Sequence, residues 1–428
     1  MSSKKSPFDL QTCARHNILQ LQPYRCARDD YKDDGTNILL DANENAFGPS
    51  LALDGSSLSS KSSGDPLIDF FGLNRYPDPH QLGLKKLLCN LRNTHVHTNK
   101  TLTPESLFVG VGSDEAIDAL IRCFCVPGRD NILVCPPTYG MYSVSAQVND
   151  VGLVKIPLLP APEFAVDVAA ITSELSTNSS VKIIYICSPG NPTGSLIKKE
   201  DLQAILEHPT WNGIVVMDEA YIDFAPEGSS VAEWVLEWPN LVVMQTLSKA
   251  FGLAGIRLGV AFTSPPIASL LGNMKAPYNI ANPTSEIATL ALKESGLQVM
   301  RTNRSRIIAQ RERLLDELPK VPGVGRFRGG TESNFLLVEM LDGQGKADNV
   351  TALQVYELLA ENRGVVVRFR GKEHGCLGCL RITIGTEEEV TRFLKEIKDV
   401  LEQVHAGSTK VDVEAEEKKE TDANGIVS

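Results

Sequence analysis

The sequence predicts an α/β protein with a mainly parallel sheet and a second, smaller α/β domain. Apolar runs of strand length recur along the chain, for example at 131–135, 181–187 and 213–217, and segments with helical spacing of apolar residues lie between them. This alternation is typical of a parallel sheet that helices cover. Most of these runs end in a short polar cluster, and ligands of such sheets bind beyond the carboxyl ends of the strands, so we expect one site there.

Length and composition exclude several classes of protein. The 428 residues are enough for two domains, and 42% hydrophobic with 22% charged residues is ordinary for a globular protein. The net charge of −11 argues against a nucleic-acid partner. No apolar run approaches the roughly 20 residues of a membrane helix. The first residues lack the apolar stretch of a secretory signal, so we expect a cytoplasmic protein.

The nine cysteines are scattered through apolar segments, which favours reduced thiols over a disulfide framework. Cys376 and Cys379 form a Cys-x-x-Cys pair two residues after His374. A structural zinc site needs four ligands, and no second cysteine pair with that spacing is present, so we predict no metal.

The ends of the chain and one insert have little apolar content. Residues 1 to about 16 are polar and expected to be loose. The serine-rich stretch 51–69 reads as a flexible loop, and the Glu- and Lys-rich segment 406–428 as a disordered tail.

The stretch 107–125 predicts a strand that ends in Gly-Val-Gly, followed by a helix that Ser113 or Asp114 caps. Free backbone N–H groups at the start of a helix bind phosphate well. An ordinary strand-to-helix turn explains the pattern equally well.

Polar residues follow the next three strands. Tyr139 comes after the first and could stack on a flat cofactor, although a core tyrosine is the commoner explanation. Asn191 lies in a loop that flanking prolines hold rigid. Asp218 ends an apolar strand, where burial without a partner is costly, and a pyridinium N–H would supply that partner. Tyr221 lies three residues further on.

The segment 246–259 holds Ser248, Lys249 and Arg257 between two apolar runs. A desolvated lysine loses its proton more easily, and a neutral amine can attack a carbonyl. Lysine, hydroxyl and arginine together suit an aldehyde that carries a phosphate, which is pyridoxal 5′-phosphate (PLP). The alternative is a loop lysine beside a structural arginine.

The last third predicts a long helix over 285–318 and then a smaller domain of antiparallel character. Its expected strands are 331–338, 364–368 and 380–385, and its expected helices are 351–359 and 387–404. Arg368 and Arg381 lie inside apolar runs, so each is expected to face an anion, with a partner carboxylate as the alternative.

With these motifs together, residues 18–404 resemble the PLP-dependent aminotransferases of fold type I, in the class II aminotransferase family. The resemblance rests on the segments 39–45, 74–79, 137–142, 218–221, 246–259 and 379–385. The arm around Asn43 and the segment around Arg381 resemble the branch that acts on histidinol phosphate. Ser113 stands where the family often has alanine, which a backbone contact tolerates.

The resemblance implies a large domain over 70–290 with a mainly parallel seven-stranded sheet, a small domain over 291–405, and an N-terminal arm over 1–50 that joins the small domain and the active site. Lys249 would carry PLP and move the proton between the substrate carbon and the C4′ atom of the cofactor. Asp218 would keep the pyridine nitrogen protonated. The family's remaining cofactor contacts fall on Ser113, Asp114, Tyr139, Asn191, Tyr221, Thr246, Ser248 and Arg257. Tyr139 would stack on the ring, while Asn191 and Tyr221 would bind O3′ and the others the phosphate.

The resemblance also implies a homodimer, because Tyr76 would reach the cofactor phosphate of the partner subunit. Tyr24, Asn43, Arg368 and Arg381 would bind the substrate. The expected reaction converts L-histidinol phosphate and 2-oxoglutarate to imidazole-acetol phosphate and L-glutamate, in histidine biosynthesis.

Other functions remain open at this point. An aminotransferase for aromatic amino acids would use the same machinery, and a PLP-dependent decarboxylase or lyase would share the fold. A non-catalytic PLP-binding regulator would need a DNA-binding module, for which the residues before Ile18 leave no room. An NAD-dependent dehydrogenase would need a glycine fingerprint that the sequence lacks.

Overall fold

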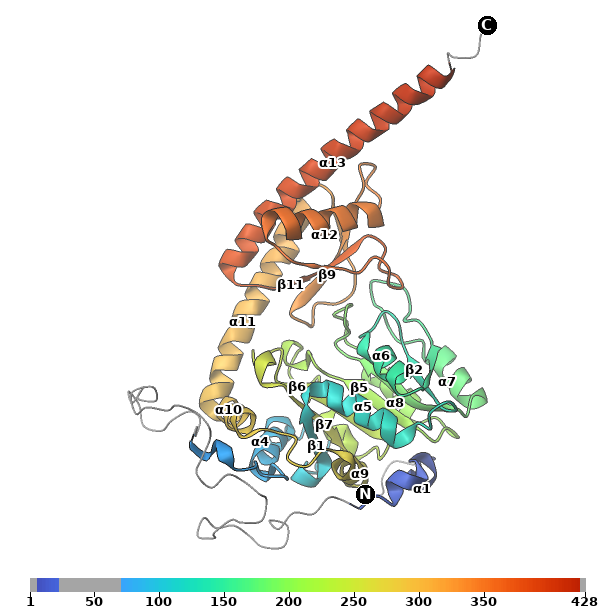
Figure 1. Ribbon diagram of the computed structural model, residues 1–428, viewed down its shortest axis with the longest axis vertical. Coiled ribbons are helices and arrows are strands. Elements are labelled where there is room, and N and C mark those ends of the chain that lie inside the picture. The colour runs from blue at the N-terminus through green and yellow to red at the C-terminus, as the bar shows by residue number, and fades with distance from the viewer. Residues whose placement is uncertain (1–5, 23–70, 424–428) are drawn as a thin grey trace.

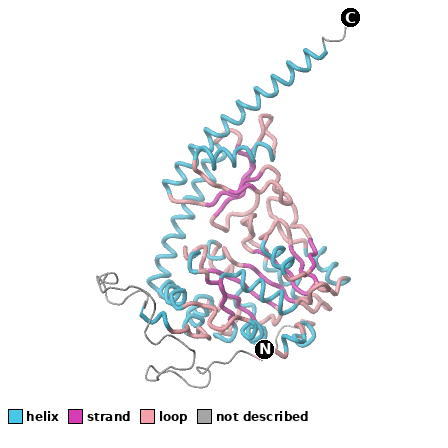
Figure 2. The backbone as a smooth tube through the Cα atoms, in the orientation of Figure 1, coloured by secondary structure: helices cyan, strands magenta, loops and turns pink. Residues whose placement is uncertain are grey.

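The computed structural model describes residues 6–22 and 71–423, with side chains up to residue 407 apart from residue 71. Tyr24, Asn43, most of the predicted arm and the serine-rich loop lie outside the described residues. The described chain forms two sheets; helices cover both faces of the larger sheet and one face of the smaller sheet (Figures 1 and 2).

The larger sheet has seven strands in the order β1-β7-β6-β5-β4-β2-β3. Its strands are β1 (Leu107–Val111), β2 (Asn131–Val134), β3 (Gly152–Lys155), β4 (Val181–Cys187), β5 (Ile214–Asp218), β6 (Leu241–Thr246) and β7 (Leu258–Thr263). All neighbouring pairs are parallel except those of β7, which runs antiparallel to both β6 and β1. The predicted mainly parallel, seven-stranded sheet is therefore confirmed.

Both faces of this sheet are buried, because alternate side chains of its strands enter two different cores. In β5, Val215 and Met217 join one core, while Ile214 and Val216 join the other. Helices α4 (Leu82–Arg92), α7 (Val168–Thr177), α8 (Lys199–Leu206) and α10 (Asn282–Leu292) cover the first core, and α5 (Gly112–Phe124), α6 (Met141–Val148) and α9 (Pro265–Met274) cover the second.

The expectation that the first sixteen residues are loose is wrong for residues 6–16. Helices α1 (Leu10–Cys13) and α2 (His16–Leu19) place Cys13 and Ile18 in the second core. The Asp9 side chain caps α1 by accepting the Gln11 N–H at 3.0 Å, and the Arg15 N–H donates to the Cys123 carbonyl at 2.9 Å. Two well-placed apolar side chains are enough to anchor this otherwise polar segment.

The smaller sheet is antiparallel throughout, in the order β10-β11-β9-β8. Its strands are β8 (Val324–Phe327), β9 (Phe335–Met340), β10 (Arg368–Phe369) and β11 (Cys379–Thr383), and α12 (Asn349–Arg363), α11 (Glu294–Glu317) and α13 (Glu387–Ala423) pack against it. Figure 1 shows α11 running from the large sheet to this small domain. The long helix predicted over 285–318 is in fact two, because Lys293 has an extended backbone (φ −71°, ψ 159°) between α10 and α11.

Helix α13 continues to Ala423, through residues for which the composition predicts disorder. Glu and Lys are good helix formers, which is consistent with this extension. Figure 1 shows the end of α13 pointing away from both sheets. Within the described residues, no helix is both long and apolar enough to cross a membrane.

The eight cysteines that the structure describes are free and buried. Burial raises the pKa of each of the Cys135, Cys123 and Cys376 thiols to about 12. Cys376 and Cys379 donate to the carbonyls of His374 and Leu377. Among the described residues, no group of three or more His, Cys, Asp or Glu side chains could hold a metal ion.

Gly259 on β7 lies against the start of α5. A Cβ atom at this position would be 2.3 Å from both the Gly112 carbonyl carbon and the Ser113 nitrogen, which are backbone atoms that cannot rotate away. We expect Gly259→Ala to lower the free energy of unfolding by about 1–3 kcal/mol or more, measured by urea denaturation. Gly272→Ala in α9 is the control, because its Cβ would meet nothing within 4 Å. Equal stability of the two variants would contradict the close approach.

Candidate active site

A cavity of about 650 Å³ lies where the carboxyl ends of the parallel strands face the small domain. Twelve of the residues predicted from the sequence line it: Ser113, Asp114, Tyr139, Asn191, Asp218, Tyr221, Thr246, Ser248, Lys249, Arg257, Arg368 and Arg381. They come from seven separate segments of the chain, and the sheet topology brings these segments together.

Asp218, the last residue of β5, is buried at 2% exposure. Its carboxylate accepts the Tyr142 hydroxyl at 2.6 Å and the Ala220 N–H at 3.1 Å. Burial raises the pKa of Asp218, and these two hydrogen bonds partly oppose that shift. A cationic N–H group in the cavity would therefore stabilise the charged carboxylate, which is costly to bury alone.

Lys249 lies three residues after the end of β6 and lines the same cavity. The side chain is accessible through the cavity, yet the surrounding protein is the main cause of its lowered pKa, and the Arg381 charge adds to the effect. The Asp218 charge opposes it. The Lys249 Nζ lies 5.5 Å from the centre of the Tyr221 ring, which meets the Phe335 ring edge to face at 5.1 Å. The amine thus loses its proton more readily than a free lysine.

One end of the cavity is suited to an anion. Helix α5 begins at Gly112 with Val111 as its N-cap, so the predicted capping by Ser113 or Asp114 is wrong. Instead, the Glu115 carboxylate accepts the Val111 N–H. Because the first N–H groups of a helix have no partner within it, those of Ser113 and Asp114 are in position for an anion.

Three side chains complete this end. Arg257, with a left-handed backbone (φ 52°, ψ 59°), places Nη2 3.5 Å from the Asp114 carboxylate. A Cβ at Gly112 would lie 2.7 Å from the same Nη2, so glycine makes room for the guanidinium. The Thr246 hydroxyl lies 2.9 Å from the Ser248 hydroxyl. A guanidinium, two hydroxyls and helix N–H groups are the donors that a phosphate needs.

Tyr139, Asn191 and the small-domain arginines also line the cavity. The Tyr139 hydroxyl donates to Asp114 at 3.2 Å, and burial raises its pKa to about 12. Arg381 Nη1 donates to the Asn191 amide oxygen at 2.5 Å, while Arg381 Nε is buried without a hydrogen-bond partner among the described residues. Arg368 lies opposite Arg381 in the β10–β11 register.

This donor set fits PLP. The anion end matches the phosphate, the buried Asp218 carboxylate matches the pyridine N–H, and Lys249 matches the aldehyde carbon. The Tyr139 ring lines the cavity and meets the buried Tyr142 ring edge to face at 5.6 Å. Each of these matches rests on residues that line the cavity.

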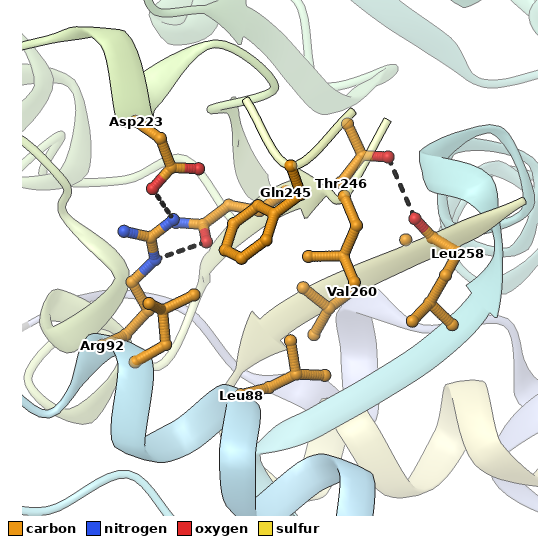
Figure 3. Close-up of a pocket in the computed structure, with 11 residues that line it drawn as sticks. Leu88, Arg92, Asp223, Gln245, Thr246, Leu258 and Val260 are labelled. Carbon is orange, nitrogen blue, oxygen red and sulfur yellow. Dashed lines mark hydrogen bonds and ion pairs between the residues drawn. The ribbon is translucent and has the colours of Figure 1, made fainter. Parts of the chain in front are cut away.

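A rigid polar network supports the turn that carries Lys249 (Figure 3). Arg92 of α4 donates to the Gln245 amide oxygen and to the Asp223 carboxylate, both at 2.7 Å. Gln245 in turn donates to the buried Glu219 carboxylate at 2.7 Å. The network borders a void of only about 10 Å³, lined by apolar side chains such as Leu88, so the end of β6 has little freedom to move.

The sequence analysis missed Tyr142, which supports Asp218, and Arg370, which lines the cavity, and one predicted residue lies elsewhere. Tyr142, near the start of α6, donates to Asp218 at the end of β5, and no spacing in the sequence indicates that contact. Arg370 follows β10 and lines the cavity. Tyr76 does not line it; its ring is 49% exposed and stacks on Tyr278 at 4.6 Å.

Tyr142→Phe tests the support of Asp218. The change removes the hydroxyl donor, so the pKa of Asp218 should rise further and its charged form should be less favoured. We expect kcat to fall by about 10- to 100-fold, the effect of one hydrogen bond to a charged group. Tyr185→Phe is the matched control, because Tyr185 stacks on Tyr142 at 4.7 Å but donates to the Ile117 carbonyl instead. An equal loss in both variants would show that general packing, and not the Asp218 contact, is responsible.

Comparisons with known proteins support the same kind of site. The family Aminotransferase class I and II matches residues 36–397. A histidinol-phosphate aminotransferase of Schizosaccharomyces pombe is 52% identical over 400 residues, covering 93% of this chain and 99% of its own. That of Saccharomyces cerevisiae is 47% identical over 402 residues, covering 92% and 98%. The structure of a histidinol-phosphate aminotransferase from Sinorhizobium meliloti in complex with pyridoxal-5′-phosphate is similar in fold, with a TM-score of 0.67 at 22% identity, covering 85% of this chain and 90% of that one.

Proposed function

Because the chain belongs to the class I and II aminotransferases, and within them to the histidinol-phosphate aminotransferases, we propose that it transfers the amino group of L-histidinol phosphate to 2-oxoglutarate. The products are imidazole-acetol phosphate and L-glutamate, a step in histidine biosynthesis. The observation that carries this proposal is the shared cavity, which has one anion site at the start of α5 and a second set of cations from the small domain. Two anion sites suit a cofactor and a substrate that both carry phosphate.

PLP, when bound, supplies an electron-accepting ring that stabilises negative charge on the substrate carbon. The protein contributes the groups around it. We propose that Ser113, Asp114, Thr246, Ser248 and Arg257 hold its phosphate. Asp218 holds the proton on the pyridine nitrogen, and Tyr142 orients Asp218. Tyr139 lies against the ring, and Asn191 and Tyr221 bind its O3′ atom.

Lys249 is the residue that moves the proton. A neutral amine is required to accept a proton from the substrate carbon, and burial together with the Arg381 charge lowers the pKa of Lys249 in that direction. The network of Arg92, Gln245 and Glu219 holds the preceding strand end in place. Lys249 can therefore act from a fixed position.

Arg368 and Arg381 bind the anionic group of the substrate. They lie opposite each other across β10 and β11, and Arg381 also contacts Asn191, so substrate and cofactor sites are joined by one hydrogen bond. We propose that Tyr24 and Asn43 from the N-terminal arm close over the substrate. These two belong to the proposal through the family resemblance alone.

An aminotransferase for aromatic amino acids is the second candidate. The small domain presents only cations to the cavity among the described residues, which favours a phosphate over an aromatic ring. A transamination assay with 2-oxoglutarate tests this directly. We expect kcat/KM for histidinol phosphate to exceed that for phenylalanine by at least about 100-fold. Comparable values would overturn the substrate assignment and leave the reaction type intact.

We further propose that the enzyme is a cytoplasmic homodimer in which Tyr76 reaches the cofactor phosphate of the partner subunit. The exposure of Tyr76 and its position outside its own subunit's cavity support this arrangement. Light scattering of the purified protein measures its mass, and we expect the mass of a dimer. We also expect Tyr76→Phe to bind PLP more weakly while it remains a dimer.

A further inference from the structure

The described part of the small domain contributes three residues to the cavity lining, and all three are arginines: Arg368, Arg370 and Arg381. The two carboxylates in that lining, Asp114 and Asp218, belong to the large domain. Asp114 pairs with Arg257, and Asp218 bonds to Tyr142. One wall of the cavity is therefore cationic without a carboxylate of its own in the lining.

Arg370 is held at this wall by its backbone and by one ion pair. Its N–H donates to the Cys379 carbonyl at 2.9 Å, which continues the β10–β11 pairing by one residue. Its Nη1 donates to the Glu373 carboxylate at 2.6 Å. Asn349 fixes the loop from both ends, through the Gly371 carbonyl at 3.0 Å and the Gly378 N–H at 2.8 Å.

The hydrogen bonding of this pair is incomplete within the described residues. Arg370 Nε is buried and has no partner, and neither has Glu373 Oε2. Arg381 Nε, on the same wall, is also buried and unpartnered. Unsatisfied buried donors are costly, so they point to an acceptor that a ligand supplies.

We propose, on the basis of the proposed function, that Arg370 is a specificity-determining residue that binds the phosphate of the substrate, and that Glu373 holds its guanidinium while that phosphate is absent. A phosphate monoester near neutral pH carries a charge of about −1.5 to −2 on three oxygens, whereas a carboxylate carries −1 on two. Three guanidinium groups suit the phosphate, and two are enough for the carboxylate. Arg370 thus favours histidinol phosphate over glutamate at a wall that both must use.

The test compares Arg370→Gln with Lys372→Gln in the PLP-loaded enzyme, whose cofactor phosphate site is filled. Lys372 is exposed, lies two residues away and does not line the cavity. Its variant therefore makes the same change in net charge outside the cavity. We expect Arg370→Gln to lower kcat/KM for histidinol phosphate by about 10- to 100-fold and to weaken competitive inhibition by inorganic phosphate equally. It should change kcat/KM for glutamate less than about threefold. Lys372→Gln should leave all three within about twofold, because exposed charges are screened.

Glu373→Gln separates binding from mere support of the loop. If Glu373 restrains Arg370, its removal tightens inhibition by inorganic phosphate about two- to fivefold. If the ion pair only supports the fold, Glu373→Gln weakens phosphate as Arg370→Gln does, and the proposal is overturned. Equal losses for histidinol phosphate and glutamate in Arg370→Gln also overturn it. Should Arg370→Gln fail to fold, the direction of the Glu373→Gln effect still decides.

The two proposals fail in different ways. If the wild-type enzyme does not use histidinol phosphate, the proposed function is wrong. If it does, and the ratio between histidinol phosphate and glutamate is the same in Arg370→Gln and wild type, only the role of Arg370 is wrong.

Discussion

Lys249→Ala is expected to reduce transamination by at least about 10⁴-fold, the upper range for loss of a positioned proton-transfer group. No other lysine lines the cavity among the described residues, so no neighbouring amine can replace it. Lys249→Arg should not restore activity, because a guanidinium stays protonated at any pH the protein survives. The measurement is the steady-state rate of glutamate formation from histidinol phosphate.

Lys198→Ala provides the control for this variant. Lys198 is exposed at the start of α8 and lies away from the cavity, so its rate should equal that of the wild type. Residual activity of Lys249→Ala above about 1% of wild type would contradict the assignment of proton transfer to this amine.

Asp218→Asn is expected to lower kcat by about 10²- to 10³-fold, the effect of losing one preorganised, buried charge. An amide has almost the same shape, and its one oxygen can keep the Ala220 N–H as donor, while its NH2 group can donate to the Tyr142 hydroxyl in place of the present contact. It cannot hold a proton on a pyridine nitrogen by charge. The loss should therefore appear in kcat, with PLP still bound.

Stability distinguishes this effect from misfolding. Burial raises the pKa of Asp218 in the folded protein above its unfolded value, so its contribution to stability is present at low pH and is lost as pH rises through the folded pKa. Without PLP, Asp218→Asn should therefore unfold at the same or a higher temperature than the wild type at pH 7. Asp130→Asn, a buried carboxylate just before β2, should leave kcat unchanged. A kcat loss in Asp130→Asn as large as that in Asp218→Asn would contradict the special role of Asp218.

Much of the fold could be predicted because the central strands are long apolar runs. β4 and β6 are almost wholly buried, and the 3.6-residue pattern of α4 is clear. β3 and β8 were missed because they are short and partly exposed, with no apolar run to mark them. The break at Lys293 was missed although Gly296 lies three residues further on. A Cβ at Gly296 would lie 2.4 Å from the Ala291 carbonyl oxygen, so glycine lets the start of α11 approach the end of α10.

The candidate site shows the same division. Asp218, Lys249 and Arg257 could be predicted because each is a charged residue at or near the end of a strand-length apolar run, Arg257 directly before one, where burial demands a partner. Tyr142 and Arg370 could not be predicted, for two different reasons. Tyr142 is 76 residues from Asp218 in the sequence. Arg370 lies in a polar loop three residues before Glu373, and that carboxylate gives it an ordinary partner. Tyr24 and Asn43 lie outside the described residues, so their proposed roles remain predictions.

The most direct test of the central claim is the absorbance spectrum of the purified PLP-loaded protein before and after histidinol phosphate is added. We predict that the visible or near-ultraviolet band of the bound cofactor shifts to that of its pyridoxamine form, and that 2-oxoglutarate restores the first spectrum. Phenylalanine should produce the shift only weakly. If no chromophore binds even when PLP is supplied, the assignment of Lys249, Asp218 and the anion end of the cavity to this cofactor is contradicted.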